Sequence, residues 1–465
     1  MTRYTPVTDS DREAMLAAIG VASLAELFGE IPESVRLGRP LELPASLGEA
    51  EVYEHLRALA SRNSSTEESL CFLGAGMYDN YVPAVVDMLM GRSEFLTPYT
   101  PYQPEISQGG LQVMFEYQTA ICELTGMDVS NASVYEGPSA LAAAGYLAKL
   151  TNGRPRFVVS RGVHPHARET LRTLSVGYGT SVEEVELRDG ATDPRAWAAA
   201  IGDDVSAVFL AQPNFLGAVE DLAPLIAAAR EHGALVVCSA DPIALGIVEA
   251  PGRLGVDVCV GEGQTLGNRL DFGGPSFGFF AAREEHLRRM PGRIAGETRD
   301  VDGRRGFVLT LQTREQHIRR EKATSNICTA QALNALAGVV YLSWLGREGF
   351  VELAELLARR TAYARERLCS LDGVSALHEQ PVVREFALSL GLADVDSVRR
   401  VIARCAGERV EPGYALGRDY PEHPDALLVA LSERRSREDI DRLVDVLGRA
   451  LAAERAAAAA GGAAA

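Results

Sequence analysis

The sequence predicts an α/β protein with a large, mostly parallel β-sheet between a helical arm and a small α+β domain. Between about residues 150 and 290, short apolar segments alternate with helical segments, which is the pattern of successive βαβ units. Several apolar segments are uninterrupted, as expected for strands that helices cover on both faces. With 465 residues, 47% of them hydrophobic, the chain can bury a core of the size that such a fold needs.

The first part of the chain, residues 1–65, is expected to form a helical arm. A first helix should end at Gly20, where the apolar spacing stops. Ser46 and Glu49 are spaced as in a capping box, which predicts a second helix over residues 52–59. The polar run at residues 62–66 then separates the arm from the next domain.

The large α/β domain is expected over residues 66–325. Its strands are predicted at residues 157–160, 182–187, 207–211, 235–239, 256–260 and 278–281. Its helices are predicted at residues 139–150, 166–174, 222–232 and 284–290.

The small α+β domain is expected over residues 326–451. It should begin with a long helical stretch over residues 329–345 and 350–368. Strands at 385–390 and 426–431, with helices at 395–405 and 436–451, complete it. The alanine-rich tail, residues 452–465, is of low complexity and is expected to be disordered. This order of parts predicts the aminotransferase-like fold, which is fold type I of the enzymes that use pyridoxal phosphate (PLP).

Composition disfavours several classes of function. The formal net charge of −17 argues against nucleic acid and anionic membranes as partners. No apolar run predicts a membrane span, and the start of the chain lacks the pattern of a secretory signal. The seven cysteines lie singly, without CxxC spacing, which fits reduced thiols in the cytoplasm. No metal site is expected, because His164 and His166 have no carboxylate at a matching helical offset.

Lysine is almost absent from the sequence. PLP enzymes hold the aldehyde of the cofactor as a Schiff base with a lysine. The chain has only Lys149 and Lys322 among its 46 basic residues. Residues 261–267 follow a predicted strand, where the Schiff-base lysine normally projects, and Gln264 takes its place. A glutamine amide is not nucleophilic, so no internal aldimine is expected at this position.

Two further positions match a PLP site without its lysine. Asp241 ends a predicted strand, where an aspartate would pair with the pyridine nitrogen of the cofactor. The alternative for Asp241 is an aspartate that caps the next turn or faces solvent. Ser139 follows a Gly-Pro pair at a helix start, which is a favourable place for a phosphate, although an ordinary capped helix fits equally well. Ser139, Asp241 and Gln264 are therefore interpreted as vestigial positions of a PLP site.

The densest polar segment is the loop over residues 92–110. Its prolines at 98, 101 and 104 exclude a regular helix and predict an extended, rigid loop. Hydroxyl, amide and carboxylate groups on such a loop favour a binding surface over a simple connection. The candidate binding residues are Tyr99, Tyr102, Gln103, Glu105, Ser107 and Gln108.

Several segments together resemble the glycine cleavage system P-protein family. They are LGAGMYD at 73–79, RSEF at 92–95, the run 99–109, EYQT at 116–119, LTGMD at 124–128 and REKATSNIC at 320–328. More narrowly, they resemble subunit 1, the alpha subunit of the two-chain bacterial form. The resemblance covers nearly the whole chain apart from the tail, and the run 99–109 is its most specific part.

The resemblance implies an activity that is shared with a second chain. In that family, alpha and beta subunits have related folds and assemble as αβ pairs, and the lysine that holds PLP belongs to beta. The missing lysine agrees with this independently. The pair decarboxylates glycine and passes the aminomethyl group to the lipoyl arm of H-protein. The loop with Tyr99 and Tyr102 is then expected to wall the active site across the αβ interface and to help bind glycine or the lipoyl arm.

One departure from the family pattern lies at the start of the helix that carries Ser139. The family usually has an aspartate followed by Gly-Ala-Thr-Ala, where this chain has EGPSA at 136–140. Proline and the longer acid argue against residual phosphate binding.

Two alternative functions stay open. One is an independent PLP aminotransferase or decarboxylase with an atypical lysine such as Lys322, and the other is a non-catalytic regulatory pseudoenzyme.

Overall fold

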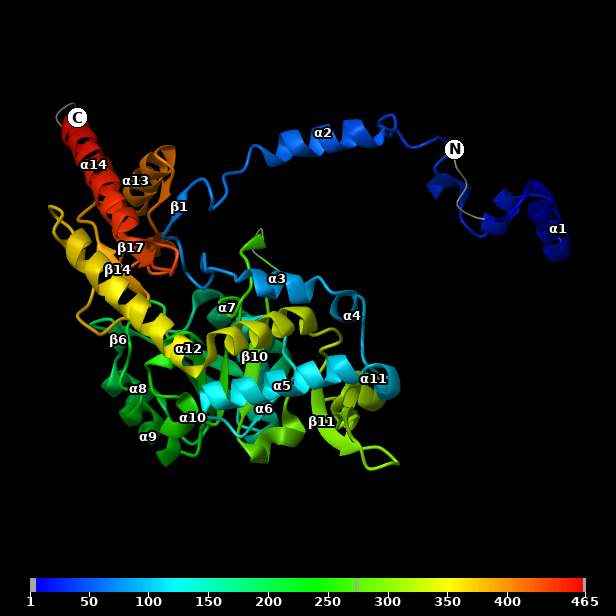
Figure 1. Ribbon diagram of the computed structural model, residues 1–465, viewed down its shortest axis with the longest axis horizontal. Coiled ribbons are helices and arrows are strands. Elements are labelled where there is room, and N and C mark those ends of the chain that lie inside the picture. Colours follow the sequence, from blue (N-terminus) through cyan, green and yellow to red (C-terminus); the bar gives the residue numbers. More distant parts are fainter. Residues whose placement is uncertain (1–5, 272–273, 275, 463–465) are drawn as a thin grey trace. The chain divides into compact units, whose positions relative to one another are not determined.

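A computed structural model describes residues 6–271, 274 and 276–462 of the chain. The chain divides into two compact units, with the boundary between Ser64 and Ser65. The second unit is built around a seven-stranded sheet of order β2-β10-β9-β8-β7-β3-β4 (Figure 1). The strands are β2 (Val129–Ser130), β3 (Arg156–Ser160), β4 (Ser181–Val185), β7 (Val205–Gln212), β8 (Leu235–Ala240), β9 (Val258–Glu262) and β10 (Gly278–Ala282).

Within this sheet, the neighbouring strands β4, β3, β7, β8 and β9 are parallel. Strand β10 is antiparallel to β9, and β2 is antiparallel to β10. All six strands predicted for this domain are confirmed, with shifts of one or two residues at their ends. Strand β2 was not predicted, because two residues are too few to show a period.

Helices cover both faces of the sheet, which explains the uninterrupted apolar strands. On one face, α6 (Gly137–Asn152) and α7 (Pro165–Tyr178) pack on Phe157, Phe209 and Val260. On the other face, Val158, Val208 and Val236 meet α8 (Pro194–Ala200) and α9 (Ala223–Glu231). Helix α5 (Gln108–Thr125) and the start of α12 (Ala332–Cys369) cover the β9–β10 part of that second face.

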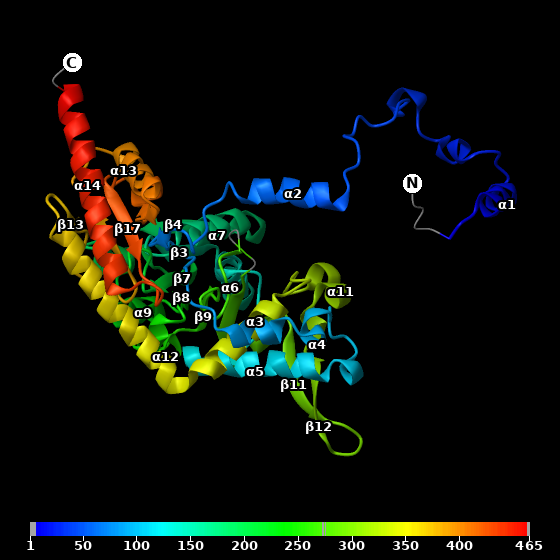
Figure 2. The ribbon, with the colours of Figure 1, turned by 45° about the horizontal axis from the view of Figure 1, so that its top comes forward.

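Two elements of this unit differ from the prediction. The helix expected at 284–290 is a short 3₁₀ helix, η6 (Glu284–Arg289). A hairpin of β11 (Ile294–Arg299) and β12 (Arg305–Thr310) was not predicted, because charged residues near its turn hide the strand alternation. Its base packs on α5, where the Gln118 side chain bonds the N–H and the carbonyl of Ala295 (2.8 and 3.0 Å). Its tip projects past α5 in Figure 2.

The long predicted helical stretch is confirmed as α12, with non-helical backbone at Gly346. The residue has a φ of +62°, which glycine adopts at little cost, and this is why the sequence reads as two helices.

The C-terminal part of the chain forms a four-stranded antiparallel sheet that packs against two helices. The strands are β13 (Ser375–Ala376), β14 (Glu385–Ser389), β17 (Ala426–Ala430) and β16 (Tyr414–Ala415), and the helices are α13 (Val395–Gly407) and α14 (Arg437–Gly462).

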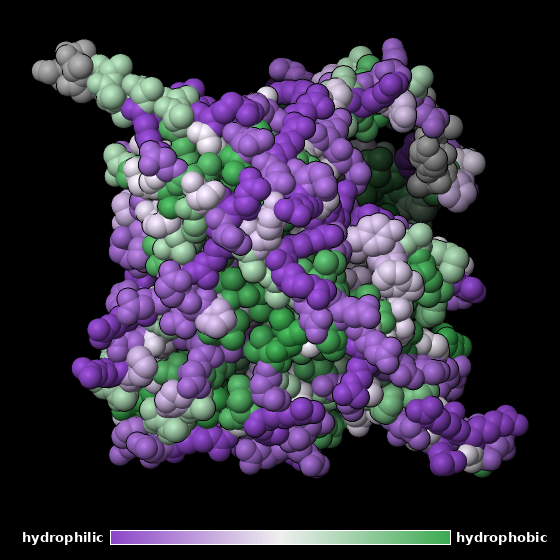
Figure 3. Space-filling model, turned by 60° about the vertical axis from the view of Figure 1, so that its left-hand side comes forward, coloured by the Kyte–Doolittle hydropathy of each residue, from purple (hydrophilic) through white to green (hydrophobic). Residues whose placement is uncertain are grey.

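The prediction of a disordered tail from residue 452 is wrong for its first part, because α14 continues to Gly462. Buried Glu454 accepts a hydrogen bond from Arg400 (2.8 Å), which ties this turn of the helix to α13. Alanine has the highest helix propensity, so low complexity here is compatible with helix. The alanine-rich end of α14 projects from the rest of this unit (Figures 1 and 3). Residues 463–465 of the predicted tail lie outside the described residues.

The predicted end of the arm at residue 65 lies within one residue of the observed boundary, but the residues that follow need reassignment. Strand β1 (Leu70–Cys71) pairs in parallel with β15 (Val410–Glu411), and Phe72 packs into the core of the C-terminal part. The first residues after the arm therefore belong with the small domain, although the prediction places them in the large one.

The arm, described by itself, contains α1 (Asp9–Ile19), η1 (Leu24–Phe28), η2 (Glu33–Val35) and α2 (Glu49–Ala60). Both predicted helices are present, but the predicted capping box of Ser46 and Glu49 is wrong. Helix α2 starts at Glu49, and the N–H of Gly48 donates to Glu51 (2.7 Å). Of residues 6–64, none is buried. In the described part of the chain, no helix combines the length and the apolar character needed to cross a membrane.

Candidate functional site

A cavity of about 380 Å³ lies at the carboxyl ends of β7, β8 and β9. Crevices at this edge of an open α/β sheet are the usual ligand sites of such folds. The start of α6 and residues of β14 close the cavity from other sides. The charged and polar side chains that line it include Tyr78, Glu136, His164, Asp241, Glu262, Thr265, Ser276, Arg384 and Glu385.

Asp241 lies in this cavity, as the sequence predicts, but it already has a cationic partner. Nε of Arg384 lies 2.5 Å from Oδ2 of Asp241, and both side chains are largely buried. The Arg384 guanidinium also lies 3.5 Å from the centre of the Tyr78 ring. The other oxygen of Asp241 accepts the N–H of Ile243 (3.1 Å), which is the capping role left open as an alternative. A pyridinium ring would have to displace Arg384 in order to pair with Asp241.

The N-terminus of α6 is occupied by carboxylates of the chain itself. Glu136 caps the helix and accepts the N–H of Ser139 (3.0 Å) as well as its hydroxyl. Glu262 accepts the N–H of Gly137 (3.0 Å), and its other oxygen accepts the N–H of Gln264 (3.0 Å) and the hydroxyl of Ser276. Burial raises the pKa of Glu262. Since these groups use the donors that a phosphate would need, an anion would meet two acids here.

Gln264 takes part in a buried cross-link, with no exposed surface. Its side-chain oxygen accepts the N–H of Tyr78 (2.9 Å), and its Nε2 donates to the carbonyls of Tyr78 (3.0 Å) and Asn268 (2.8 Å). The amide therefore holds the loop of residues 75–78 against the end of β9.

Neither lysine lines the cavity. Lys149 donates to the carbonyl of Gly153 (3.0 Å), and Lys322 is exposed in the 3₁₀ helix Arg320–Lys322.

These residues do not fit PLP. The Schiff-base position holds a hydrogen-bonded glutamine, the aspartate is paired with Arg384, and the phosphate position is filled by Glu136 and Glu262. Of the three positions interpreted as vestigial, Asp241 lines the cavity, whereas Ser139 and Gln264 do not, and all three have hydrogen-bond or ion-pair partners within the chain.

Sequence reasoning missed two groups of the cavity, because they come from distant parts of the chain. Glu385 of β14 accepts the N–H of Ala75 (2.7 Å) and the hydroxyl of Tyr78 (2.8 Å), and burial raises its pKa to about 7. Nε2 of His164 donates to the carbonyl of Ala75 (3.0 Å), and burial lowers the pKa of His164 to about 4, so the ring is neutral at neutral pH.

The polar loop with Tyr99 and Tyr102 does not line the cavity. Tyr99 is 76% exposed, and its hydroxyl lies 3.1 Å from that of Thr329. The Tyr102 hydroxyl accepts a hydrogen bond from Arg293 (3.3 Å), whose guanidinium lies over the ring. Gln103 and Glu105 are exposed.

The loop over residues 92–110 is less extended than its prolines predict. It contains the short helices α4 (Ser93–Leu96) and η3 (Pro104–Ile106), and α5 starts at Gln108 with Ser107 as its N-cap. Gln108 is a structural residue here, because its amide bonds the N–H and the carbonyl of Phe307 in β12 (both 2.8 Å).

The sheet order and the small C-terminal domain define fold type I of the PLP-dependent enzymes. A sphingosine-1-phosphate lyase from Burkholderia pseudomallei has this fold, with a TM-score of 0.64 at 16% identity, over 93% of this chain and 97% of the other. A cysteine desulfurase from Escherichia coli has it too, with a TM-score of 0.58 at 16% identity, over 83% and 97% of the two chains. These likenesses concern the fold alone.

Closer similarity identifies the family. The sequence model of the glycine cleavage system P-protein matches residues 2–447. A protein of Moorella thermoacetica named "Probable glycine dehydrogenase (decarboxylating) subunit 1" is 49% identical over 449 residues, which cover 97% of this chain and 100% of that protein. A protein of the same name from Geobacillus kaustophilus is 47% identical over 446 residues, covering 96% and 98%. A crystal structure of a glycine decarboxylase (P-protein) of the glycine cleavage system, in inhibitor-bound form, matches with a TM-score of 0.86 at 42% identity, over 97% and 100%. The chain belongs to the glycine cleavage system P-protein family.

Proposed function

We propose that this chain is subunit 1, the alpha subunit, of a two-chain glycine decarboxylase of the glycine cleavage system. With a second subunit it would decarboxylate glycine and pass the aminomethyl group to the lipoyl arm of H-protein. The observation that carries the proposal is the full-length similarity to proteins named subunit 1, in a chain that has Gln264 where the sequence predicts the Schiff-base lysine.

The cofactor is proposed to be on the partner. PLP bound by the second subunit would supply the electron sink that decarboxylation of glycine needs. In this chain, Gln264, Glu136 and the Asp241–Arg384 pair support that division of labour, because they leave the cavity without a Schiff-base lysine or an open phosphate position.

The arm supports a requirement for a partner chain. On α2, Val52, Leu56 and Leu59 share one helix face and are each at least 40% exposed. Because none of residues 6–64 is buried, the arm has little hydrophobic stabilisation of its own. We propose that the second subunit covers this face in αβ pairs, which assemble further into a heterotetramer.

The seven cysteines form no disulfide, which supports a reducing compartment. We take this compartment to be the cytoplasm.

The loop of residues 99–108 is proposed to face the active site of the partner. Tyr99, Tyr102, Gln103 and Glu105 are exposed, and their hydroxyl, amide and carboxylate groups suit contact with glycine or with the lipoyl arm. Ser107 and Gln108 hold the loop on α5 and β12 and would act as supports for it.

Reconstitution tests the proposal. Each subunit is purified separately and assayed, alone and mixed, for exchange of labelled CO₂ with the carboxyl group of glycine in the presence of lipoylated H-protein. We expect activity only in the mixture, and no formation of a stable pair when residues 1–64 are deleted from this chain. Full activity of the second subunit alone would support the regulatory alternative, and activity of this chain alone would support the independent PLP enzyme.

A further inference from the structure

A second group of potential ligands lies at the end of the sheet that is opposite the cavity. Asp257 directly precedes β9, whereas Glu262 at the other end of β9 lines the cavity. Glu285 and His286 belong to η6, which follows β10. Because β10 is antiparallel to β9, with Ala282 paired to Val258, the end of β10 lies beside the start of β9. This register brings Asp257 next to η6, although 28 residues separate it from Glu285 in the sequence.

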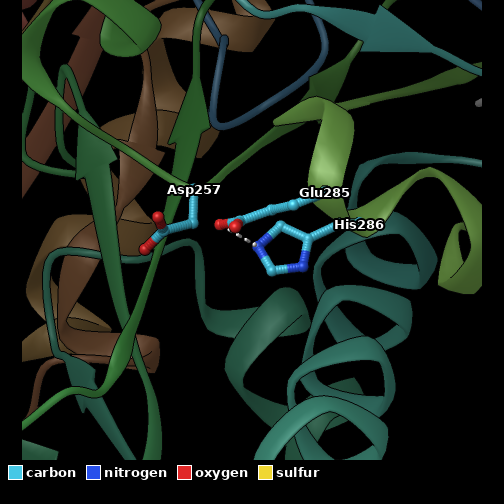
Figure 4. A group of neighbouring side chains, drawn as sticks. All are labelled: Asp257, Glu285 and His286. Carbon is cyan, nitrogen blue, oxygen red and sulfur yellow. Dashed lines mark ion pairs between the residues drawn. The ribbon is translucent and has the colours of Figure 1, made fainter.

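The three side chains offer one imidazole nitrogen and two carboxylates, as Figure 4 shows. One ligand atom from each lies within 4.8 Å of the others. Nε2 of His286 faces Oε1 of Glu285 at 3.5 Å, and this contact is marked in Figure 4. Asp257 is held in place by the N–H of Val236, which donates to its Oδ2 (2.7 Å). Such an outer hydrogen bond is typical of carboxylates that coordinate metals.

The unpartnered imidazole of His286 points to a ligand. The residue is only 4% exposed, and neither of its ring nitrogens has a hydrogen-bond partner. A buried polar group without a partner is costly, which favours an occupant that satisfies it. Cations near the group include Arg230, whose Nη2 lies 3.7 Å from Oδ1 of Asp257 and donates to the carbonyl of Gly255 (2.5 Å).

We propose that Asp257, Glu285 and His286 bind a divalent transition-metal ion, with zinc as the ion that this donor set suits best. Zinc takes imidazole nitrogen and carboxylate oxygen at about 2.0–2.2 Å in a tetrahedral arrangement. The fourth position would hold water. The ligand atoms must move closer together than 4.8 Å, and the Glu285 side chain, which is 74% exposed, has the freedom to do so.

A metal at this place would be structural. It would join the start of β9 to η6 and so fix the edge of the sheet at which β9 and β10 meet. None of the three residues lines the cavity, so this site does not depend on the proposed enzymatic function.

Zinc titration of the full-length, untagged chain tests the proposal by calorimetry and by thermal unfolding. The background carries Cys328→Ser, because Cys328 is an exposed thiol that could bind zinc on its own. Glu285→Gln removes one ligand from an exposed position and should leave the fold intact, and Asp257→Asn removes another. Glu284→Gln is the matched control, since Glu284 is the exposed neighbour outside the group.

We expect saturable binding of one zinc ion per chain and a rise in Tm with zinc, since a ligand that binds only the folded state stabilises it. Glu285→Gln and Asp257→Asn should weaken binding at least tenfold, the order of loss seen when even an outer partner of a ligand is removed. Glu284→Gln should bind as tightly as the background protein. Absence of saturable binding, or equal binding by all the variants, would overturn the proposal, and the second result would indicate adventitious zinc only.

Discussion

The cavity and the loop of residues 99–108 use polar side chains in opposite ways. In the cavity, Asp241 is paired with Arg384 and Glu262 accepts the N–H of Gly137, and the fully buried Gln264 next to them donates to the carbonyl of Tyr78. On the loop, Tyr99 and Gln103 are exposed to solvent. Around the cavity, the polar side chains are therefore engaged in internal cross-links, whereas the loop keeps polar groups available for a partner. On this fold, polar residues at the usual ligand site can contribute to stability instead of binding.

The largest expected effect concerns Gln264. Gln264→Ala removes the side-chain partner of the N–H of Tyr78 and of the buried carbonyl of Asn268. Leaving buried groups unsatisfied costs about 1–3 kcal/mol each, so we expect the free energy of unfolding to fall by about 3 kcal/mol or more. The loop residue Gln103 is the matched control, and Gln103→Ala should change stability by about 0.5 kcal/mol at most. Urea unfolding measures both, and equal losses would remove the contrast between the two regions.

The loop tyrosines should show the reverse behaviour. Tyr99→Ala removes an exposed side chain, so the stability of this chain should change little, whereas Tyr102→Ala also removes the hydrogen-bond partner of the buried Arg293 and should cost about 1 kcal/mol. In the assembled pair, however, we expect CO₂ exchange to fall about tenfold or more, as typically results when a positioning group at an active site is lost. Conservative variants with Phe keep the ring and show whether the hydroxyl matters. Unchanged exchange activity in both alanine variants would mean that the loop does not reach the active site.

The pH dependence of stability should reveal Glu385. Burial raises its pKa from the ordinary 4.5 to about 7, so the folded state binds more protons than the unfolded state between these values. The contribution of Glu385 is therefore fully present below pH 4.5 and is lost as the pH rises to about 7. Glu385→Gln, which cannot ionise, should lose less free energy of unfolding than the wild type between pH 5 and pH 8. Parallel curves for the two proteins, followed by urea unfolding, would refute the assignment.

The smallest effect is expected at the start of α6. The double variant Glu136→Gln, Glu262→Gln removes two acids from a helix N-terminus, where backbone N–H groups favour anions. Inorganic phosphate should then raise the Tm of the variant by a few degrees, which corresponds to about 1 kcal/mol or less in a chain of this size. The wild type should not respond to phosphate. An equal response of both proteins would show that the carboxylates do not exclude anions.

The sequence predicts the fold well where the apolar pattern is long. The six central strands and the two parts of α12 are present because uninterrupted apolar runs and helical periods survive in the packed structure. The hairpin of β11 and β12 and the helical end of α14 escaped prediction. In the hairpin the charged residues hide the strand period, and in the tail the low complexity hides a strong helix former.

The site was predictable only in part. The absence of a lysine at Gln264 follows directly from the sequence, as does the placement of Asp241 at a strand end. That Arg384 neutralises Asp241, and that Glu385 bonds Tyr78, depends on β14, which joins the cavity from more than 140 residues away in the sequence. No local pattern encodes such contacts.

The central claim is that this chain does not hold PLP itself, and the visible spectrum of the purified chain with added PLP tests it most directly. The spectrum is recorded before and after borohydride, and the reduced protein is then examined by mass spectrometry. We expect no aldimine band and no stoichiometric adduct, while the second subunit under the same conditions shows both. A stoichiometric adduct on Lys149 or Lys322 would instead mean that this chain is a PLP-binding enzyme by itself.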